Sequence, residues 1–537
     1  MGVGAARAEG YWRGLAVSLA FMAAALIGCA EHPTEVDTRP GYRERHRPQL
    51  HFSPPAMWMN DPNGLVYHAG EYHLYYQFYP NDRVWGPMHW GHAVSRDLFH
   101  WEHLPIALAP DQHGYIFSGS AVVDHHNSSG FGTDGEPPMV AIYTYHDPER
   151  ARLQTGDHES QAIAYSNDRG RSFRKYAGNP VLPNPGGKPD FRDPKVFWYE
   201  PGQQWVMALS VHDRVQFWAS NNLRNWRFLS EFGQNWGGHD GTWECPDLFP
   251  IRVEGSDQLK WVLLLNLNPG GPQGGSGTQY FVGDFNGHEF TLEPRFADTL
   301  RQQPAVWLDW GRDNYAGVTW SDAPLPDHQR LFIGWMSNWD YAQQVPTEPW
   351  RSAMTLPRVL SLTEQPQGYR IRGLPAPQLD QLRGASKALP AMRLSNTRML
   401  SEFDGLPIAT SELTIEAQPQ ADTVFGLELS NALGERYRLG FDSASNTYFS
   451  DRSEAGDHTF SDQFARVHRA PREQHGGPIR LRLVLDVASV ELFADDGLTV
   501  LTDTFFPSQP FDRITLYSEG GATELSEISL TGLRRVW

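Results

Sequence analysis

The stretch S-R-D-L-F-H-W at Ser95–Trp101 returns in altered form as S-N-D-R-G-R-S-F at Ser166–Phe173 and as S-N-N-L-R-N-W at Ser220–Trp226. D-F-N-G-H-E-F at Asp284–Phe290 resembles a divergent fourth copy. The copies follow one another at intervals of roughly 50 to 70 residues, a spacing typical of sheets repeated around an axis. The repeat therefore predicts a β-propeller.

The residues around the repeat carry a strand and turn pattern. From about residue 50 to 365, short aromatic-rich or alternating runs are separated by turn residues, as in Leu65–Tyr67, Ala69-Gly70 and Tyr72–Tyr79. Such runs on either side of a short turn indicate β-hairpins. In a propeller the innermost strands surround a central funnel, so side chains that are distant in sequence can meet there.

The residue composition and pattern of the chain change near Gln365. Residues 366–383 contain Pro375 and Pro377, which favour a connector. Strand patterns follow, for example at 480–485 and 487–493, without a helical period of comparable strength. The chain is therefore predicted to be all-β, with a propeller over 50–365, a linker over 366–383 and a β-sandwich over 384–537.

Three carboxylates stand in short segments rich in turn residues. Asp61 lies in W-M-N-D-P-N-G (58–64), Asp193 in F-R-D-P and Glu244 in W-E-C-P. Each could instead be structural: Asp61 could lie in a tight turn, Asp193 could form an ion pair with Arg192, and Glu244 could lie in an edge strand. Together they favour glycoside hydrolysis, which needs one acid to protonate the leaving oxygen and one carboxylate to meet the oxocarbenium ion.

No metal or cofactor is predicted. The sequence has no H-E-x-x-H, C-x-x-C or phosphate-loop motif. Cys245 follows Glu244 without evident His and Asn partners, so it is interpreted as a small packed thiol rather than a nucleophile. The net charge of −18 disfavours nucleic acid and suits a neutral sugar.

The order of the three acidic motifs resembles glycoside hydrolase family 32, the β-fructosidases, which include invertases, inulinases and levanases. The resemblance covers roughly residues 45 to 537. It continues through Y-Y-Q-F-Y-P (75–80), W-G-P-M-H-W-G-H (85–92), F-S-G-S (117–120), W-M-S-N-W-D-Y-A (335–342) and P-W-R-S (349–352).

The resemblance implies five blades, a C-terminal β-sandwich and a retaining mechanism. Asp61 would be the nucleophile, Glu244 the acid and then the base, and Asp193 the transition-state stabiliser, kept ionised with help from Arg192. Pro87 departs from the family pattern, so the resemblance does not determine the geometry of the outer subsite near Trp85. The implied substrate contacts are Asn60, Gln77, Trp85, Phe117, Ser118, Arg192 and Trp335.

The expected activity is exo-hydrolysis of terminal, non-reducing β-D-fructofuranosides from levan or inulin, with sucrose also cleaved. A fructosyltransferase would use the same covalent intermediate. An inverting five-bladed enzyme acting on arabinan or xylan would need a wider separation of its carboxyl groups. A non-catalytic fructan-binding lipoprotein is the alternative from a different class, and the presence of all three acids argues against it.

The N-terminus predicts export. Arg7 and Arg13 precede an apolar run over 14–28 with the proportions of a secretory signal. The following Cys29 resembles the acylated residue of a bacterial lipoprotein, which would make 1–28 a signal peptide and 29–49 a tether. The protein would then be anchored by lipid alone to the bacterial envelope, either at the outer membrane, on its periplasmic face, or at the cell surface. The sequence does not indicate an oligomeric state.

Overall fold

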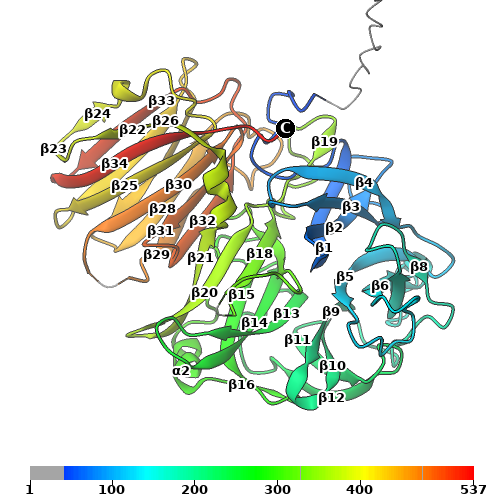
Figure 1. Ribbon diagram of the computed structural model, residues 1–537. Helices are drawn as coiled ribbons and strands as arrows, with labels where there is room; N and C mark the ends of the chain where they lie inside the picture. Colours follow the sequence, from blue (N-terminus) through cyan, green and yellow to red (C-terminus); the bar gives the residue numbers. More distant parts are fainter. Residues whose placement is uncertain (1–40, 327, 475) are drawn as a thin grey trace, which may run out of the picture. The chain divides into compact units, whose positions relative to one another are not determined.

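The computed structural model describes residues 41–326, 328–474 and 476–537, so Cys29 and the predicted signal peptide lie outside the described residues. Two groups of β-sheets make up the described chain (Figure 1). The helices are α1 (Pro148–Arg152), α2 (Pro294–Gln302) and the 3-10 helices η1 (Glu200–Gly202), η2 (Pro377–Leu382) and η3 (Ser401–Phe403). None of them has the length and hydropathy needed to cross a lipid bilayer.

Five sheets form the predicted five-bladed propeller, and each begins with its inner strand. The inner strands β1, β5, β9, β13 and β17 contact one another in order, and β17 contacts β1, which closes the ring. The blades are β1 (Met57–His68), β2 (Glu71–Tyr79), β3 (His89–Ser95), β4 (Trp101–Leu108); β5 (Tyr115–Val123), β6 (Met139–His146), β7 (Glu159–Ser166), β8 (Arg174–Lys175); β9 (Phe191–Tyr199), β10 (Gln204–Val211), β11 (Arg214–Ser220), β12 (Arg227–Phe232); β13 (Thr242–Arg252), β14 (Leu259–Asn268), β15 (Gly277–Phe285), β16 (Phe290–Leu292); and β17 (Tyr315–Thr319), β18 (Arg330–Trp335), β20 (Arg358–Gln365), β21 (Gly368–Pro375).

The sequence repeat is the turn that joins the third and fourth strands of a blade. In the first copy the side chain of Asp97 accepts the N–H of His100 at 2.8 Å. In the second, Asp168 accepts the N–H of Ser172 at 2.9 Å. In the third, Asn222 takes the place of the acid. Short Asp and Asn side chains mimic a backbone turn, which explains why this part of each blade keeps its sequence.

A two-residue strand, β19 (Trp350–Arg351), pairs in parallel with the start of β1 at Met57 and Trp58. It follows β18 in the chain, so the last blade contributes a strand to the first blade. The guanidinium of Arg47 lies 3.8 Å from the centroid of the Trp350 ring and covers this pairing. We call the pairing of β19 with β1 the ring clasp.

Two further sheets pack around one apolar core and form the predicted β-sandwich. Its strands appear in yellow to red in Figure 1. One sheet holds β22 (Arg383–Leu389), β23 (Met392–Leu394), β34 (Thr523–Leu533), β25 (Ser411–Pro419), β30 (Ile479–Asp486), β31 (Ser489–Ala494) and β32 (Thr499–Thr504), and the other holds β24 (Thr397–Met399), β33 (Arg513–Glu519), β26 (Val424–Ser430), β27 (Arg436–Asp442), β28 (Thr447–Glu454) and β29 (Val467–Pro471).

Buried ion pairs join the propeller to the sandwich. Arg358 of β20 contacts Asp309 at 2.8 Å and donates from Nε to Glu491 of β31 at 2.9 Å. His51 contacts Asp486 at 2.7 Å and Glu491 at 2.9 Å. The side chains of all five residues are at most 1% exposed. We call them the interface network.

Two predicted boundaries differ from the structure. The expected linker over 366–383 includes β21, which pairs along its whole length with β20 and completes the fifth blade, because Pro375 comes only at its end. The part of the expected tether from Gly41 to Gln49 packs on the folded body, with Arg47 fully buried. Both stretches contain turn-forming residues, which led the sequence analysis to predict connectors where the structure has packed or paired segments.

Candidate active site

A β-bulge interrupts each of the five inner strands near its N-terminal end, where two residues face one on the neighbouring strand. A bulge interrupts the hydrogen-bond ladder locally and changes the direction of the side chains on the bulged residues. Bulges are common beside active sites. Proline is tolerated there because the extra residues need not donate to the ladder. The bulged pairs are Asn60-Asp61, Phe117-Ser118, Asp193-Pro194, Cys245-Pro246 and Ala316-Gly317.

Asp61 stands on the bulge of β1 and is held by two neutral donors. The Ser118 hydroxyl donates to its Oδ2 at 2.6 Å, and the Asn60 amide donates to its Oδ1 at 3.0 Å. Burial and the charge of Glu244 raise the pKa of Asp61, while these two hydrogen bonds lower it. The contacts fix the orientation of the carboxylate without matching its charge with a cation.

Asp193 occupies the bulge of β9 with a φ of 64°, a left-handed conformation that is uncommon outside glycine. Its N–H donates to Thr144 Oγ1 at 3.0 Å. Burial raises the pKa of Asp193 well above its usual range, although Arg192, 4.0 Å away, lowers it. The charges of Glu244 and Asp61 add to this rise, and the ionisation of Asp193 with help from Arg192 stays a prediction.

Glu244 lies directly before the bulge of β13 and makes two strong contacts. Arg192 donates to its Oε1 from Nη2 at 2.9 Å and from Nε at 3.2 Å. The hydroxyl of Tyr315 donates to Oε2. The guanidinium is held in turn by Asp190 at 2.5 Å and Glu159 at 3.3 Å. Asp190 and Glu159 thus hold Arg192, and Arg192 in turn fixes the position of Glu244.

Cys245 links the other two acids. Its N–H donates to Asp193 Oδ2 at 3.0 Å, and its sulfur lies 3.7 Å from the same oxygen and 3.6 Å from Asp61 Oδ2. Burial raises the pKa of the Cys245 thiol well above its usual range. A neutral, packed thiol is what the sequence predicted, but its position between two carboxylates was not foreseen.

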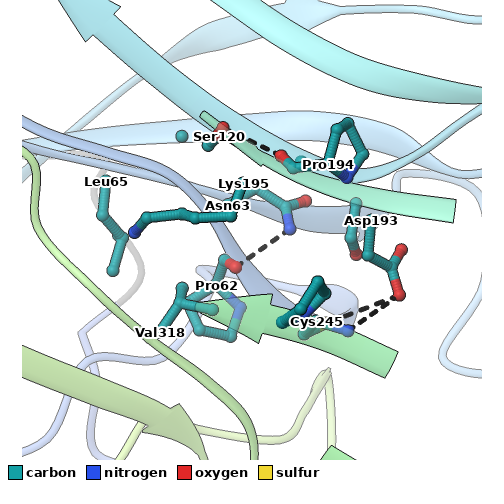
Figure 2. Close-up of a pocket in the computed structure, with 13 residues that line it drawn as sticks. Pro62, Asn63, Leu65, Ser120, Asp193, Pro194, Lys195, Cys245 and Val318 are labelled. Atoms are coloured by element: carbon teal, nitrogen blue, oxygen red, sulfur yellow. Dashed lines mark hydrogen bonds between the residues drawn. The ribbon is translucent and has the colours of Figure 1, made fainter. Parts of the chain in front are cut away.

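A small cavity of about 10 Å³, the space of roughly one water molecule, lies behind the acids. Figure 2 shows Asp193 and Cys245 at one side of it and Lys195 at the other. Residues of the bulges on β5, β9 and β13 line it together with Pro62–Leu65 of β1. The inner strands are therefore closely packed beside Asp193 and Cys245.

The predicted substrate contacts fall into exposed and supporting groups. Trp85 is 37% exposed and meets the Phe117 ring edge-on, with 6.1 Å between centroids. Phe117 stacks on His146 at 4.2 Å. Gln77 is buried and donates to Asn63 and to the carbonyl of Ile116, so it braces β1 against β5.

Trp335 has no exposed surface. It packs against Trp58 at 6.0 Å and Trp339 at 5.0 Å between ring centroids. In this conformation it offers no face to a sugar, and it supports Trp58, whose indole N–H donates to Asn60. A sequence motif alone does not distinguish such an inner ring from an exposed one.

Several residues of the site carried no readable sequence signal. Tyr315 and Glu159 contact Glu244 and Arg192, yet neither lies in the acidic motifs. Within the described residues, His146, His158 and Glu159 could approach a metal ion together, since their ligand atoms lie within 4.8 Å of one another. Because Glu159 already pairs with Arg192, we assign this cluster to positioning the guanidinium.

The chain matches two family models, "Glycosyl hydrolases family 32 N-terminal domain" over residues 51–372 and "Glycosyl hydrolases family 32 C terminal" over 378–532. It is similar to a levanase of Bacillus subtilis, with 47% identity over 92% of this chain and 72% of the levanase. An extracellular exo-inulinase of Aspergillus ficuum is 40% identical over 92% of this chain and 96% of its own. The crystal structure of an exo-inulinase from Aspergillus awamori superposes with a TM-score of 0.83, at 37% identity, over 92% of this chain and 100% of the other.

Proposed function

Because this chain belongs to the glycosyl hydrolases family 32, we propose that it releases terminal, non-reducing β-D-fructofuranosyl units from levan or inulin, and from sucrose, by hydrolysis. The observation that carries this proposal is the placement of the three acids on the ring of inner strands, with Asp61 on the bulge of β1, Asp193 on that of β9 and Glu244 directly before that of β13. The similarity to a levanase and to exo-inulinases supports the choice of fructans.

In the first step Asp61 attacks the anomeric C2 of the fructosyl unit, and the C2–O bond to the leaving sugar breaks. Glu244 gives its proton to that oxygen, and a covalent fructosyl-enzyme forms. The hydrogen bonds that Ser118 and Asn60 donate to Asp61 fix the orientation of its carboxylate and so of the lone pairs that attack C2. Precise aim matters because the effective concentration of an oriented nucleophile supplies much of the rate.

In the second step Glu244 removes a proton from water, the water oxygen bonds to C2, and Asp61 leaves as a carboxylate. Arg192 at 2.9 Å from Glu244 stabilises the charged base that this step requires. The carboxylate of Asp193 would accept hydrogen bonds from fructose hydroxyls, which become stronger donors as positive charge develops on the ring. Arg192, 4.0 Å away, favours the ionised form of Asp193.

The product profile over time tests the proposal. Purified protein is incubated with levan, inulin, sucrose and arabinan, beside Glu244→Gln. Free fructose alone from the first minutes, absent in the variant, is the expected result. Oligosaccharides appearing first would favour endo cleavage, and fructosylated products that grow with sucrose concentration would favour transfer. Proton NMR of the first product distinguishes retention from inversion at C2.

Loss of all cleavage with retained fructan binding would instead support the binding lipoprotein. The placement of Asp61, Asp193 and Glu244 argues against it, since a pure binding protein does not require a nucleophile and a proton donor on the same ring of strands.

We also propose export and anchoring through an acylated Cys29. The sequence Leu26-Ile27-Gly28-Cys29 supports acylation, and the extracellular relative supports export. Growth with labelled palmitate should label the wild-type chain and not Cys29→Ser, and the variant should appear in the soluble fraction with unchanged activity. Equal labelling of both chains would overturn the lipid anchor while leaving the enzyme proposal intact.

A further inference from the structure

A second cavity, of about 500 Å³, lies at the other end of the inner strands. Its lining includes the end of β9 at Phe197–Tyr199 and the middle of β13 at Asp247–Pro250. Asp193 and Tyr199 are on the same strand, and at about 3.3 Å per residue they stand roughly 20 Å apart. Lys195, which lies between them, lines both this pocket and the small cavity. We call this cavity, on the face away from the acids, the rear pocket. Its volume falls in the range of about 300 to 1,000 Å³ common for small-molecule sites.

Partly exposed aromatic rings form one side of the rear pocket. Trp261 lies 5.6 Å from Phe197 and 6.0 Å from Tyr199 between ring centroids. Leu259, which is 41% exposed, stands at the rim. Apolar C–H faces of sugars pack on rings of this kind, while hydroxyl groups reach polar neighbours.

A buried carboxylate with an unused acceptor lies on the opposite side. Asp247 is fully buried, and its Oδ2 accepts from Lys195 at 3.1 Å and from the N–H of Thr319 at 2.6 Å. Its Oδ1 has no hydrogen-bond partner among the described residues. An unpaired buried acceptor is costly, and a ligand hydroxyl would satisfy it.

The charges around the pocket favour a neutral ligand. Lys195 and Arg330 face it together with Asp247, Asp322 and Glu200, so both signs are present. An anion would meet three carboxylates and the overall negative charge of the protein, and a cation would meet two basic groups. A purely apolar ligand would leave Asp247 Oδ1 without a partner.

We propose that the rear pocket is a second saccharide-binding site, which takes one or two sugar units of a neutral chain. Resting on the proposed function, we infer that the chain is a segment of the fructan whose end enters the catalytic funnel. A polymer held at two faces dissociates more slowly, because the second contact acts at high effective concentration.

Calorimetric titration with a fructosyl tetrasaccharide tests this inference. Glu244→Gln, which should bind without turnover, is expected to show two sites. Adding Trp261→Ala should leave one site, and adding Trp85→Ala should weaken the other. Phe228→Ala is the matched control, since this ring is 49% exposed on β12 and does not line the pocket. Leu259→Glu serves as a second rim variant if Trp261→Ala fails to fold.

In the catalytically intact chain, Trp261→Ala should keep the kcat/KM for sucrose within twofold. The same variant should lower the rate of fructan hydrolysis at low polymer concentration several-fold. One site in Glu244→Gln, or a second site that survives both rim variants, overturns the rear pocket. Binding of inorganic phosphate that Arg330→Gln removes, without saccharide binding, overturns it in favour of an anion site. Failure of the proposed function would be seen separately, as no fructose released by the wild-type chain.

Discussion

The candidate active site and the interface network both bury carboxylates, but they treat the charge in opposite ways. At the interface, burial alone would raise the pKa values of Asp486 and Glu491, but His51 and Arg358 lower them below their usual range. In the funnel, burial prevails and the pKa values of Asp61 and Asp193 are raised. The buried acids of the interface network are matched by cations, while in the candidate active site Arg192 pairs closely with Glu244 and leaves Asp61 and Asp193 under-matched.

Removing the charge of an under-matched acid should abolish activity and spare the fold. Asp61→Asn keeps the size and the contacts with Ser118 and Asn60 but loses the nucleophile. We expect kcat to fall by about 10⁴-fold or more, as for other covalent nucleophiles. The melting temperature should stay the same or rise, since a buried charge is gone. Normal turnover by a well-folded Asp61→Asn would refute the assignment.

The reverse result is expected at the interface. Arg358→Met leaves Asp309 buried without its cation and removes one of the two basic partners of Glu491, which should cost about 3 to 5 kcal/mol of unfolding free energy. Denaturant unfolding measures this loss, and activity per folded molecule should persist. Arg436→Met is the matched control, because its pair with Glu454 is exposed and should be worth at most about 1 kcal/mol. Equal losses in the two variants would contradict the comparison.

Alkaline pH should weaken the interface before it affects the fold of the blades. Burial lowers the pKa of His51, but the hydrogen bonds that its ring donates to Asp486 and Glu491, and the charges of these two acids, prevail and raise it to about 9. Its stabilising effect is therefore complete below the unfolded value near 6.5 and is lost as pH rises through about 9. Melting temperatures between pH 6 and 10 should show this decline, and His51→Gln should flatten it. A wild-type profile that is flat across that window would rule out a charged His51.

The smallest effect is expected from one hydrogen bond in the funnel. The Ser118 hydroxyl lowers the pKa of Asp61, so Ser118→Ala should raise that pKa further. The acid limb of kcat/KM should then move to higher pH by less than about one unit, with a loss of roughly tenfold in rate. A shift to lower pH would mean that another group governs this limb.

Sequence reasoning reached the fold and the three acids for physical reasons. The Ser/Asp turn after each third strand repeats because one turn geometry recurs, and Asp-Pro and Cys-Pro pairs mark bulges where proline is tolerated. It failed where contacts are between distant segments. Nothing near Tyr315 announces its bond to Glu244, and burial of Trp335 depends on Trp58 and Trp339 rather than on its own motif.

The ring clasp makes the geometry around Asp61 depend on closure of the propeller ring. β19 pairs with Met57 and Trp58, only a few residues before Asp61, while Trp58 itself orients Asn60. The last blade must therefore be in place before the first blade can aim its carboxylate. We therefore expect a chain with an open ring to lack hydrolytic activity even though it contains all three acids.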